Sequence, residues 1–383
     1  MLPSLLRERG QSRFPRVKLV AVAKDEAAYL AEWIHHHLYF GFNEIDIYLN
    51  RTRDTSQTVL DQICYHYDQV NVHTADWIDS CQEAVRQQLQ FIVYAKAFAE
   101  CKVGNQADFI MFLDIDEFWT PSDMQNQIAE CLSDHNEADT VSFGWLNEHG
   151  GNHEFQPFSQ RVAGQLSPLV KTAINMRTEV QEMSLHLPKT RGVENRLCNG
   201  EAFIGQPDNR ECLHPELIKL RDTMIIHRMF RSELEYIAAL SRGRPSDELP
   251  LKTNRRGYNK AAGMHVLMEL KPAAYDDYRK SYEQFLNQIH LHEHLRKARE
   301  NVMLKRTEVL NQVAHMPVDN LDLVVRLFDG CSTEVRHAVS TIIKSSLQVH
   351  QLGTRHQAME LALKIKNCDF ELARFVMSKV ALM

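Results

Sequence analysis

No stretch of this sequence reaches the roughly 18 consecutive apolar residues that a membrane-spanning helix requires. The N-terminal segment, MLPSLLRERGQSRFPR, holds an apolar run too short for the core of a signal peptide. The eight cysteines form no CxxC pair and show no zinc-ligand spacing, which favours a reducing compartment. We therefore expect a cytoplasmic protein without a transmembrane segment, associated with a membrane only peripherally, through its partners or its substrate.

The chain also lacks an excess of positive charge. Its 44 Lys and Arg residues are outnumbered by 50 Asp and Glu residues, which gives a net charge of −6. Domains that bind nucleic acid are normally basic, so no nucleic-acid partner is expected. Two local basic clusters, Arg242-Gly-Arg244 and Arg255-Arg256, remain candidates for binding a phosphate.

Length and composition indicate a soluble globular protein of about two domains. The 383 residues exceed the size at which a single hydrophobic core usually stops growing. Hydrophobic residues make up 44% of the chain and charged residues 25%, which is ordinary. From about Pro272 the apolar residues repeat at helical spacing, and Thr354 to Gln357 resembles a capping box. We therefore expect an α/β domain over residues 1–265 and an α-helical domain over residues 266–383.

Predicted strands alternate with predicted helices in the first third of the chain. The strand-like runs are 17–23, 45–49, 70–72 and 109–113, and the helix-like segments between them are 26–40, 58–67 and 81–101. This alternation indicates an α/β fold, a mostly parallel sheet with helices on both faces. Further on, residues 140–143 are another strand candidate, whereas 144–165, rich in Gly, Asn and His, is typical of a loop over a site.

Polar residues follow three of the predicted strands at the point where each strand ends. They are Lys24 to Glu26, Asn50 to Asp54 and Asp114 to Asp116. Ligands of open α/β sheets bind beyond the carboxyl ends of the strands. We therefore expect these three clusters to meet at one edge of the sheet, although they are far apart in the sequence.

The third cluster, in ADFIMFLDIDEFW (107–119), combines an apolar strand with a D-x-D pair. Asp114 and Asp116 can both face a cleft if the chain bends after the strand, and two carboxylates can hold Mg²⁺ or Mn²⁺ together with substrate phosphates. Such a cation neutralises charge on a nucleotide diphosphate leaving group. The alternatives are a solvated acidic turn and a phosphatase of the haloacid dehalogenase type, in which Asp114 would be the nucleophile.

Three blocks, in the same order along the chain, resemble the family 2-like and family 92-like glycosyltransferases. KDEAAYLAEWIHHHLYFGFNEIDIYLNRTRDTS (24–56) resembles their K-N-E, E-W-x-x-x-H-x-x-x-G and I-Y-x-N pattern. ADFIMFLDIDEFW is similar to their D-x-D-E-F block, and MIIHRMFRSELEYIAALSRGRP (224–245) to their later H-Y-x-x-K-S segment. The resemblance covers about residues 17–245, and the helical C-terminal part matches no family that we can name.

The resemblance implies a GT-A fold, a nucleotide-sugar donor and a divalent cation, Mn²⁺ or Mg²⁺. It places Glu26 and Asp54 at the nucleoside, Gln90 on a helix facing the donor, Asp114 at ribose or metal, Asp116 at the metal, and His227 at the diphosphate or metal. Three positions depart from the pattern: Asp25 replaces Asn, Arg228 replaces Tyr and Arg231 replaces Lys. The two arginines keep or add positive charge, which suits a diphosphate.

An inverting transferase also needs a base that takes the proton of the acceptor hydroxyl. Glu148 lies where the family has a segment near the acceptor, with His149 and His153 as neighbouring alternatives and a solvated loop glutamate as the other interpretation. By the same resemblance, Lys171 and His186 flank the site, in contact with phosphate or acceptor or in a structural role.

The sequence therefore predicts a metal-dependent glycosyltransferase, of inverting type, that uses a nucleotide sugar, with a UDP-sugar favoured. The expected acceptor is a glycan or a lipid-linked glycan, as in surface polysaccharide or glycolipid synthesis. The C-terminal helices are candidates for binding the acceptor, a membrane surface or another subunit. The alternative is a non-catalytic relative that binds a nucleotide or a glycan without turnover.

Overall fold

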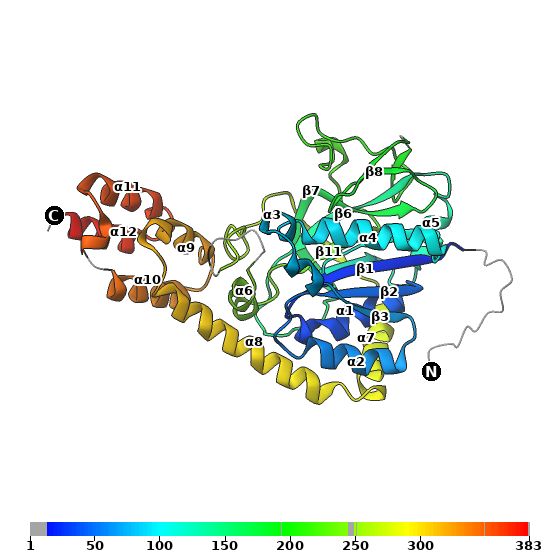
Figure 1. Cartoon of the computed structure of the whole chain (residues 1–383), viewed down its shortest axis with the longest axis horizontal. Coiled ribbons are helices and arrows are strands. Elements are labelled where there is room, and N and C mark those ends of the chain that lie inside the picture. Colours follow the sequence, from blue (N-terminus) through cyan, green and yellow to red (C-terminus); the bar gives the residue numbers. More distant parts are fainter. Residues whose placement is uncertain (1–13, 193, 244–248, 250, 348, 382–383) are drawn as a thin grey trace.

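The computed structural model describes residues 14–192, 194–243, 249, 251–347 and 349–381. Most of the N-terminal apolar run, and Arg244 of the first basic cluster, lie outside these residues. The described chain forms a large sheet with helices on both faces, followed by a group of helices at the C-terminal end (Figure 1).

The main sheet runs in the order β3-β2-β1-β4-β7-β6-β11-β5, with β10 beside β6 and β12 beside β7. Its strands are β1 (Val17–Ala23), β2 (Glu44–Leu49), β3 (Val70–Thr74), β4 (Phe109–Phe112), β5 (Glu117–Pro121), β6 (Thr140–Glu148), β7 (Arg161–Asn175), β10 (Asn195–Leu197), β11 (Thr223–His227) and β12 (His265–Glu269). From β3 to β4 all neighbouring strands are parallel, and β7 then pairs antiparallel with both β4 and β6. A separate ribbon pairs β8 (Val180–Glu182) with β9 (Lys189–Thr190). The predicted α/β class is confirmed.

The described residues form twelve α-helices, of which some cover the two faces of the parallel half of this sheet and others form the C-terminal group. They are α1 (Ala27–Tyr39), α2 (Ser56–His66), α3 (Glu83–Arg86), α4 (Leu89–Gly104), α5 (Ile128–Ser133), α6 (Glu233–Leu240), α7 (Pro272–Gln288), α8 (His292–Val313), α9 (Leu321–Leu327), α10 (Thr333–Ser346), α11 (Arg355–Ile365) and α12 (Phe370–Val380). Because side chains alternate along a strand, Leu19 and Ala21 of β1 join the core under α1, whereas Val20 joins the core under α4. Both faces of the parallel strands are therefore covered by apolar side chains, as is usual for a buried parallel sheet.

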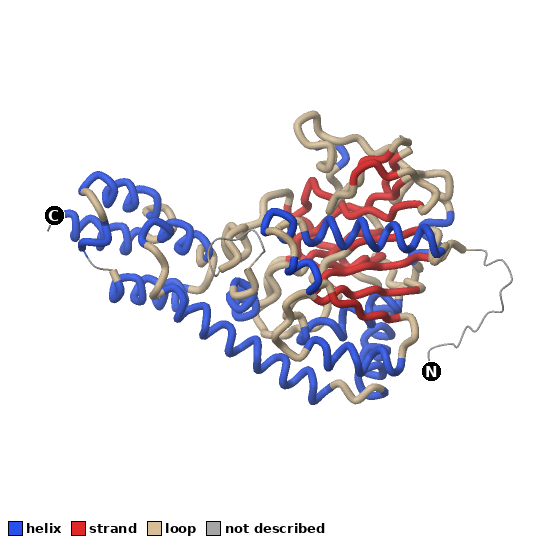
Figure 2. Tube along the Cα trace, viewed as in Figure 1, coloured by secondary structure: helices blue, strands red, loops and turns tan. Residues whose placement is uncertain are grey.

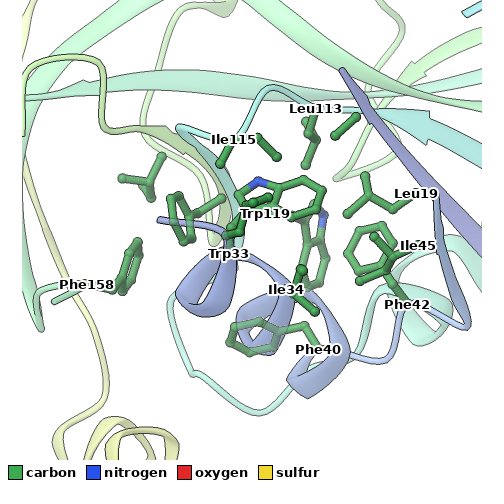
Figure 3. Packing of buried hydrophobic residues seen from close by; sticks show 14 of the residues in the cluster. Leu19, Trp33, Ile34, Phe40, Phe42, Ile45, Leu113, Ile115, Trp119 and Phe158 are labelled. Atoms are coloured by element: carbon green, nitrogen blue, oxygen red, sulfur yellow. The ribbon is translucent and has the colours of Figure 1, made fainter. Parts of the chain in front are cut away.

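Helix α1 carries much of the central core. Trp33, Ile34 and Phe40 are fully buried and belong to one cluster with Leu19 and Trp119 (Figure 3). This apolar face of α1 presses against the sheet, while the next layer is formed by α7. The burial fixes the position of the strand ends that carry the polar clusters.

A second hydrophobic core lies in the C-terminal helices. It includes residues of α6 and α9 to α12, and it extends from Phe230 to Val380. Helix α8 connects the two cores, since Leu295 and Ala298 pack in the first and Val309 and Val313 in the second. Figure 2 shows α8 running from the sheet domain to the terminal helix group. Helix α7 packs with the first core, and the domain division at residue 265 stays a prediction.

Two predicted segments differ from the structure. Residues 81–101 were expected to form one helix, but the chain forms the short 3-10 helix η1 (Asp76–Ser80), then α3, and only then α4. Gln82 has an extended backbone (φ −60°, ψ 153°), so α3 begins only at Glu83, and Gln88 (φ −96°, ψ 18°) departs from helical geometry between α3 and α4. The expected loop 144–165 is shorter, because β6 continues to Glu148 and β7 begins at Arg161, and the two strands pair in this region. By contrast, the capping box at Thr354 is present and begins α11.

Candidate active site

The D-x-D segment forms a tight connection between β4 and β5. Its apolar member, Ile115, is buried in the core (Figure 3), whereas Asp114 and Asp116 on either side of it are partly exposed. The indole N–H of Trp33 donates to the carbonyl oxygens of Asp114 (3.0 Å) and Glu117 (2.8 Å). Helix α1 therefore holds both ends of the acidic connection.

Asp114 is held by two side chains from opposite sides of the sheet edge. The Gln90 amide, at the start of α4, donates to its Oδ1 at 2.8 Å. The Lys171 ammonium of β7 lies 3.8 Å from its Oδ2. The structure therefore brings together Gln90 and Asp114, which the resemblance placed at the donor, and Lys171, which it placed at the flank of the site.

Glu117 anchors the turn from inside the protein. Its fully buried carboxylate accepts the backbone N–H of Asp114 at 2.9 Å and lies 3.0 Å from the Lys171 ammonium. Burial would lower the pKa of Lys171, but Asp114 and Glu117 raise it above its ordinary value. Lys171 therefore stays charged beside the acidic connection.

Asp116 and His227 face each other, because β11 lies between β5 and β6 in the sheet. The strand register pairs His227 with Glu117 on one side and with Asn147 on the other. The His227 Nε2 lies 3.5 Å from Asp116 Oδ2. Its ring stacks on Trp145 at a centroid distance of 4.3 Å and an angle of 7°.

The hydrogen bond on the other side of His227 defines its tautomer. Asn147 Oδ1 is an amide oxygen and only accepts, so the Nδ1–H of His227 donates to it at 2.9 Å. In the neutral ring the lone pair on Nε2 is then directed toward Asp116. Burial lowers the pKa of His227, although Asp116 opposes this shift. Burial alone would raise the pKa of Asp116, but His227, Arg231 and Arg255 hold it well below its usual value.

This pair fits a divalent cation. A carboxylate oxygen and an imidazole lone pair at 3.5 Å repel one another unless a proton or a cation lies between them. Among the described residues, no group of three or more His, Cys, Asp and Glu side chains is arranged to hold a metal ion. The donor set therefore suits a metal whose remaining ligands are phosphate oxygens and water, as is common for Mg²⁺.

Asp54 and Glu26 follow β2 and β1, as expected. Their carboxylates differ in how many hydrogen bonds they already accept within the protein. Asp54 accepts the backbone N–H groups of Ala27 (3.0 Å) and Ser56 (2.9 Å), so it caps the first turns of α1 and α2. Glu26 forms ion pairs with Arg242 and, at 3.8 Å, with Arg231. Its Oε2 is buried without a hydrogen-bond partner, which leaves an acceptor for a ligand hydroxyl.

Three of the eight described non-glycine residues with a positive φ angle lie near these side chains. Asp25, Arg51 and Arg231 have left-handed φ angles of 55°, 50° and 50°, which non-glycine residues rarely adopt. Side chains hold two of them: Asp25 accepts the backbone N–H of Arg53 at 2.6 Å, and the Arg51 guanidinium binds both oxygens of Asp79. Strain of this kind tends to gather at functional sites.

Glu148, the predicted base, belongs to a buried ion network. Arg228 donates from Nε to Glu148 at 2.9 Å and from Nη1 to Glu32 of α1 at 3.0 Å. The backbone N–H of Arg228 also donates to the carbonyl of Asp116 at 2.7 Å, so Glu148 lies beside the acidic connection. The two alternative bases have different surroundings. His149 packs against the ring of His265, and His153 is exposed.

The histidines of the run 35–37 and His186 have structural partners in the protein. His36 bonds Tyr278 and the Trp119 carbonyl, and His37 bonds the Trp33 carbonyl, so the run 35–37 does not converge on one ion. His186 donates to the carbonyl of Val170 at 2.9 Å, and its ring lies edge-on to Trp145. Burial, with Lys171 nearby, lowers the pKa of His186 to about 4.

Three contributors were missed by the sequence reasoning. Asn147 and Glu32 act through His227 and Arg228, and only the strand register and the packing of α1 show this. Lys305 of α8 forms an ion pair with Asp25 at 2.8 Å. No local pattern links a lysine in the helical region to the end of the first strand.

Fold and site together define an α/β protein with an acidic site at the carboxyl edge of its sheet. Residues 19–190, somewhat less than half of the chain, match the model of glycosyltransferase family 92. This match confirms the predicted resemblance to the family 92-like glycosyltransferases and supports glycosyl transfer. No curated protein matches the chain.

Among solved structures, the chain is similar to the mannosyltransferase PcManGT from Pyrobaculum calidifontis in complex with GDP-Man and Mn²⁺. The sequence identity is 7%, over 96% of this chain and 87% of that chain, with a TM-score of 0.32.

Proposed function

We propose that the protein is a metal-dependent glycosyltransferase that moves a sugar from a nucleotide-sugar donor to an acceptor hydroxyl. The observation that carries this proposal is the pairing of Asp116 with the Nε2 lone pair of His227 at 3.5 Å. Asp116 and His227 would hold Mn²⁺ or Mg²⁺, with Asp114 beside them at the ribose or the metal, and the cation would neutralise negative charge on the departing diphosphate. The family match supports this function over a haloacid dehalogenase-type phosphatase.

The chain's own residues bind and orient the reactants. Glu26, whose Oε2 lies 3.8 Å from Arg231 but has no hydrogen-bond partner among the described residues, and Asp54 would position the nucleoside, while Gln90 fixes Asp114. The acceptor oxygen attacks the anomeric carbon as the bond from that carbon to the diphosphate breaks, and the bonding electron pair leaves with the diphosphate. In an inverting reaction Glu148 would receive the hydroxyl proton, after its ion pair with Arg228 opens.

The finer parts of the proposal follow from the family. We propose a UDP-sugar as donor and a glycan or lipid-linked glycan as acceptor, in surface polysaccharide or glycolipid synthesis. We further propose a cytoplasmic enzyme with peripheral membrane association. No helix in the described ranges is both long and apolar enough to cross a bilayer.

The first test is thermal melting of the purified protein with UDP, GDP, CMP or ADP, each with and without Mn²⁺. Binding to the native state raises the melting temperature. We expect a metal-requiring shift with one nucleotide, and loss of that shift in Asp116→Asn. Asp277→Asn, at an exposed position on α7, is the matched control and should keep it.

Turnover separates the proposal from its alternatives. With the nucleotide sugar named by the melting assay, a transferase releases sugar slowly even without acceptor, whereas a non-catalytic binder releases none. Release of phosphate from an aryl phosphate, lost in Asp114→Asn, would instead identify a phosphatase. An Asp116→Asn variant that binds the nucleotide and Mn²⁺ like the unaltered protein would refute the metal role.

A further inference from the structure

Four basic side chains gather opposite the carboxylates of the site. They are Arg231 after β11, Arg242 after α6, and Lys252 and Arg255 in the segment that follows. Each arginine contacts the site directly: Arg231 and Arg242 reach Glu26, and Arg255 lies 3.8 Å from Asp116. We call these four residues the basic cluster.

The basic cluster is built into the protein. The side chains of Arg231, Arg242 and Arg255 are only 9%, 13% and 10% exposed. Arg231 lies over the ring of Tyr29, with its guanidinium carbon 3.4 Å from the ring centroid, and also donates to the carbonyl of Ile115. The backbone N–H of Lys252 is fixed by the carbonyl of Leu240 at 2.7 Å. The side chains of these three arginines are therefore not ordinary solvent-exposed surface charges.

Among the residues that the structure describes, the positive charges of the cluster outnumber the carboxylates that it contacts. Its ion pairs with the site involve Glu26 and Asp116, while the neighbouring Asp25 is bound by Lys305. The neighbouring cations also act on the ammonium group of Lys252. Arg255, then burial, then Arg242 lower its pKa to about 7. Concentrating buried positive charge in this way costs free energy, which a bound anion would offset.

From this geometry we infer that Arg242, Lys252 and Arg255 bind the diphosphate of the donor, on the side away from the Asp116 and His227 pair. The inference deepens the proposed function and rests on it for the identity of the donor. The anion would lie between two positive groups, the cation held by Asp116 and the basic cluster. As the glycosidic bond breaks, the charge that develops on the leaving diphosphate would be stabilised from both sides.

The test is calorimetric titration of the whole chain with pyrophosphate, the best nucleoside diphosphate and its nucleoside, in the presence of Mn²⁺. In Lys252→Met and in Arg255→Met, affinity for both diphosphates should fall about tenfold or more, because each variant loses a charge-assisted contact. Affinity for the nucleoside should change by less than about twofold, since it carries no phosphate. Lys260→Met removes a half-exposed lysine of the same segment, paired with Asp329, and should behave as the unaltered protein.

The outcomes separate the inference from the proposed function. Sugar transfer with unchanged pyrophosphate and nucleoside diphosphate affinity in both Lys252→Met and Arg255→Met would overturn the inference alone. Pyrophosphate binding that depends on both residues, without any sugar transfer, would support a diphosphate site and reject the transferase. Geranyl diphosphate bound more tightly than any nucleoside diphosphate would assign the cluster to a lipid diphosphate and overturn its assignment to the donor. The melting temperature of each variant shows that the fold is intact.

Discussion

Lys305 and Asp25 form an ion pair at 2.8 Å, although one lies on α8 and the other directly follows β1. Their side chains are 17% and 8% exposed, so water screens the pair only weakly. Asp25 also accepts the backbone N–H groups of Arg53 and Asp54. Lys305 therefore neutralises the charge that Asp25 introduces at a position where the family usually has asparagine. The same ion pair connects α8 to the loop that carries Asp54.

We expect Lys305→Met to weaken nucleotide binding several-fold, because Asp25 would lose the partner that fixes its carboxylate beneath the 53–54 loop. Combining it with Asp25→Asn tests the pair directly. The double-mutant cycle should give a coupling of about 1–3 kcal/mol in the free energy of unfolding. Lys297→Met, on an exposed part of α8, is the control. Strictly additive effects would mean that the two residues act independently.

Replacing Glu148 distinguishes a catalytic base from a structural ion pair. Glu148→Gln should lower kcat about 100-fold or more with little change in the donor KM, because the proton acceptor is lost. Glu32→Gln removes the other carboxylate that holds Arg228, and serves as the matched variant. We expect it to lower stability while kcat falls far less. Equal losses of kcat in the two variants would show that Glu148 acts only through Arg228.

Acid should destabilise the protein through the histidines of α1. Burial lowers the pKa of His35 and of His37 to about 3 each, whereas in the unfolded chain both titrate near pH 6.5. Below pH 6.5 the unfolded state binds more protons, so stability that is present above this value is lost as the pH falls. At pH 5 the loss should be about 2 kcal/mol per histidine.

Urea unfolding at pH 8, 6 and 5 measures this loss as a decrease in the extrapolated free energy. In His35→Phe the decrease between pH 8 and pH 5 should be smaller by about one histidine's share, roughly 2 kcal/mol. His315→Gln changes an exposed histidine and should leave the pH dependence as it was. A pH profile that is the same in all three proteins would contradict the assignment to α1.

Trp33 should matter for the metal site through its indole N–H. Trp33→Phe leaves the carbonyls of Asp114 and Glu117 without their buried donor, which should cost about 2 kcal/mol or more of stability. The Mn²⁺-dependent nucleotide shift should also shrink, because the acidic connection is no longer held at both ends. Trp77→Phe removes an indole bond to Thr74 at a half-exposed position and should cost less than about 1 kcal/mol. A full nucleotide shift in Trp33→Phe would show that the connection positions itself without α1.

The parallel half of the sheet could be predicted because each element carries its own local pattern. The apolar run 17–23 and the helix-spaced residues after it specify β1 and α1 without reference to the rest of the chain. The capping box at Thr354 is equally local and was predicted from four residues. The break at Gln88 was missed, since a single residue outside helical geometry leaves no periodic signal.

The site could be predicted only in outline. Carboxyl ends of parallel strands meet at one edge, and this rule alone placed Glu26, Asp54 and Asp114 together. Partners that depend on the register between strands far apart in the sequence, such as Asn147 of β6 beside His227 of β11, require knowledge of which strands are neighbours. The partner of Asp25 comes from still farther away, and its identity depends on how α8 crosses the sheet domain. The metal, donor and base assignments stay predictions.

The contact between His36 of α1 and Tyr278 of α7 joins positions 242 residues apart, at 3.1 Å. During synthesis, the first helix therefore leaves the ribosome long before the helix that covers it exists. Until α7 has been translated, the apolar side of α1, with Phe40 and Trp33, therefore stays exposed to solvent or is bound by a chaperone. Ordering such distant contacts is slow, so an expression host that translates quickly or lacks chaperone capacity should yield more aggregate of this chain.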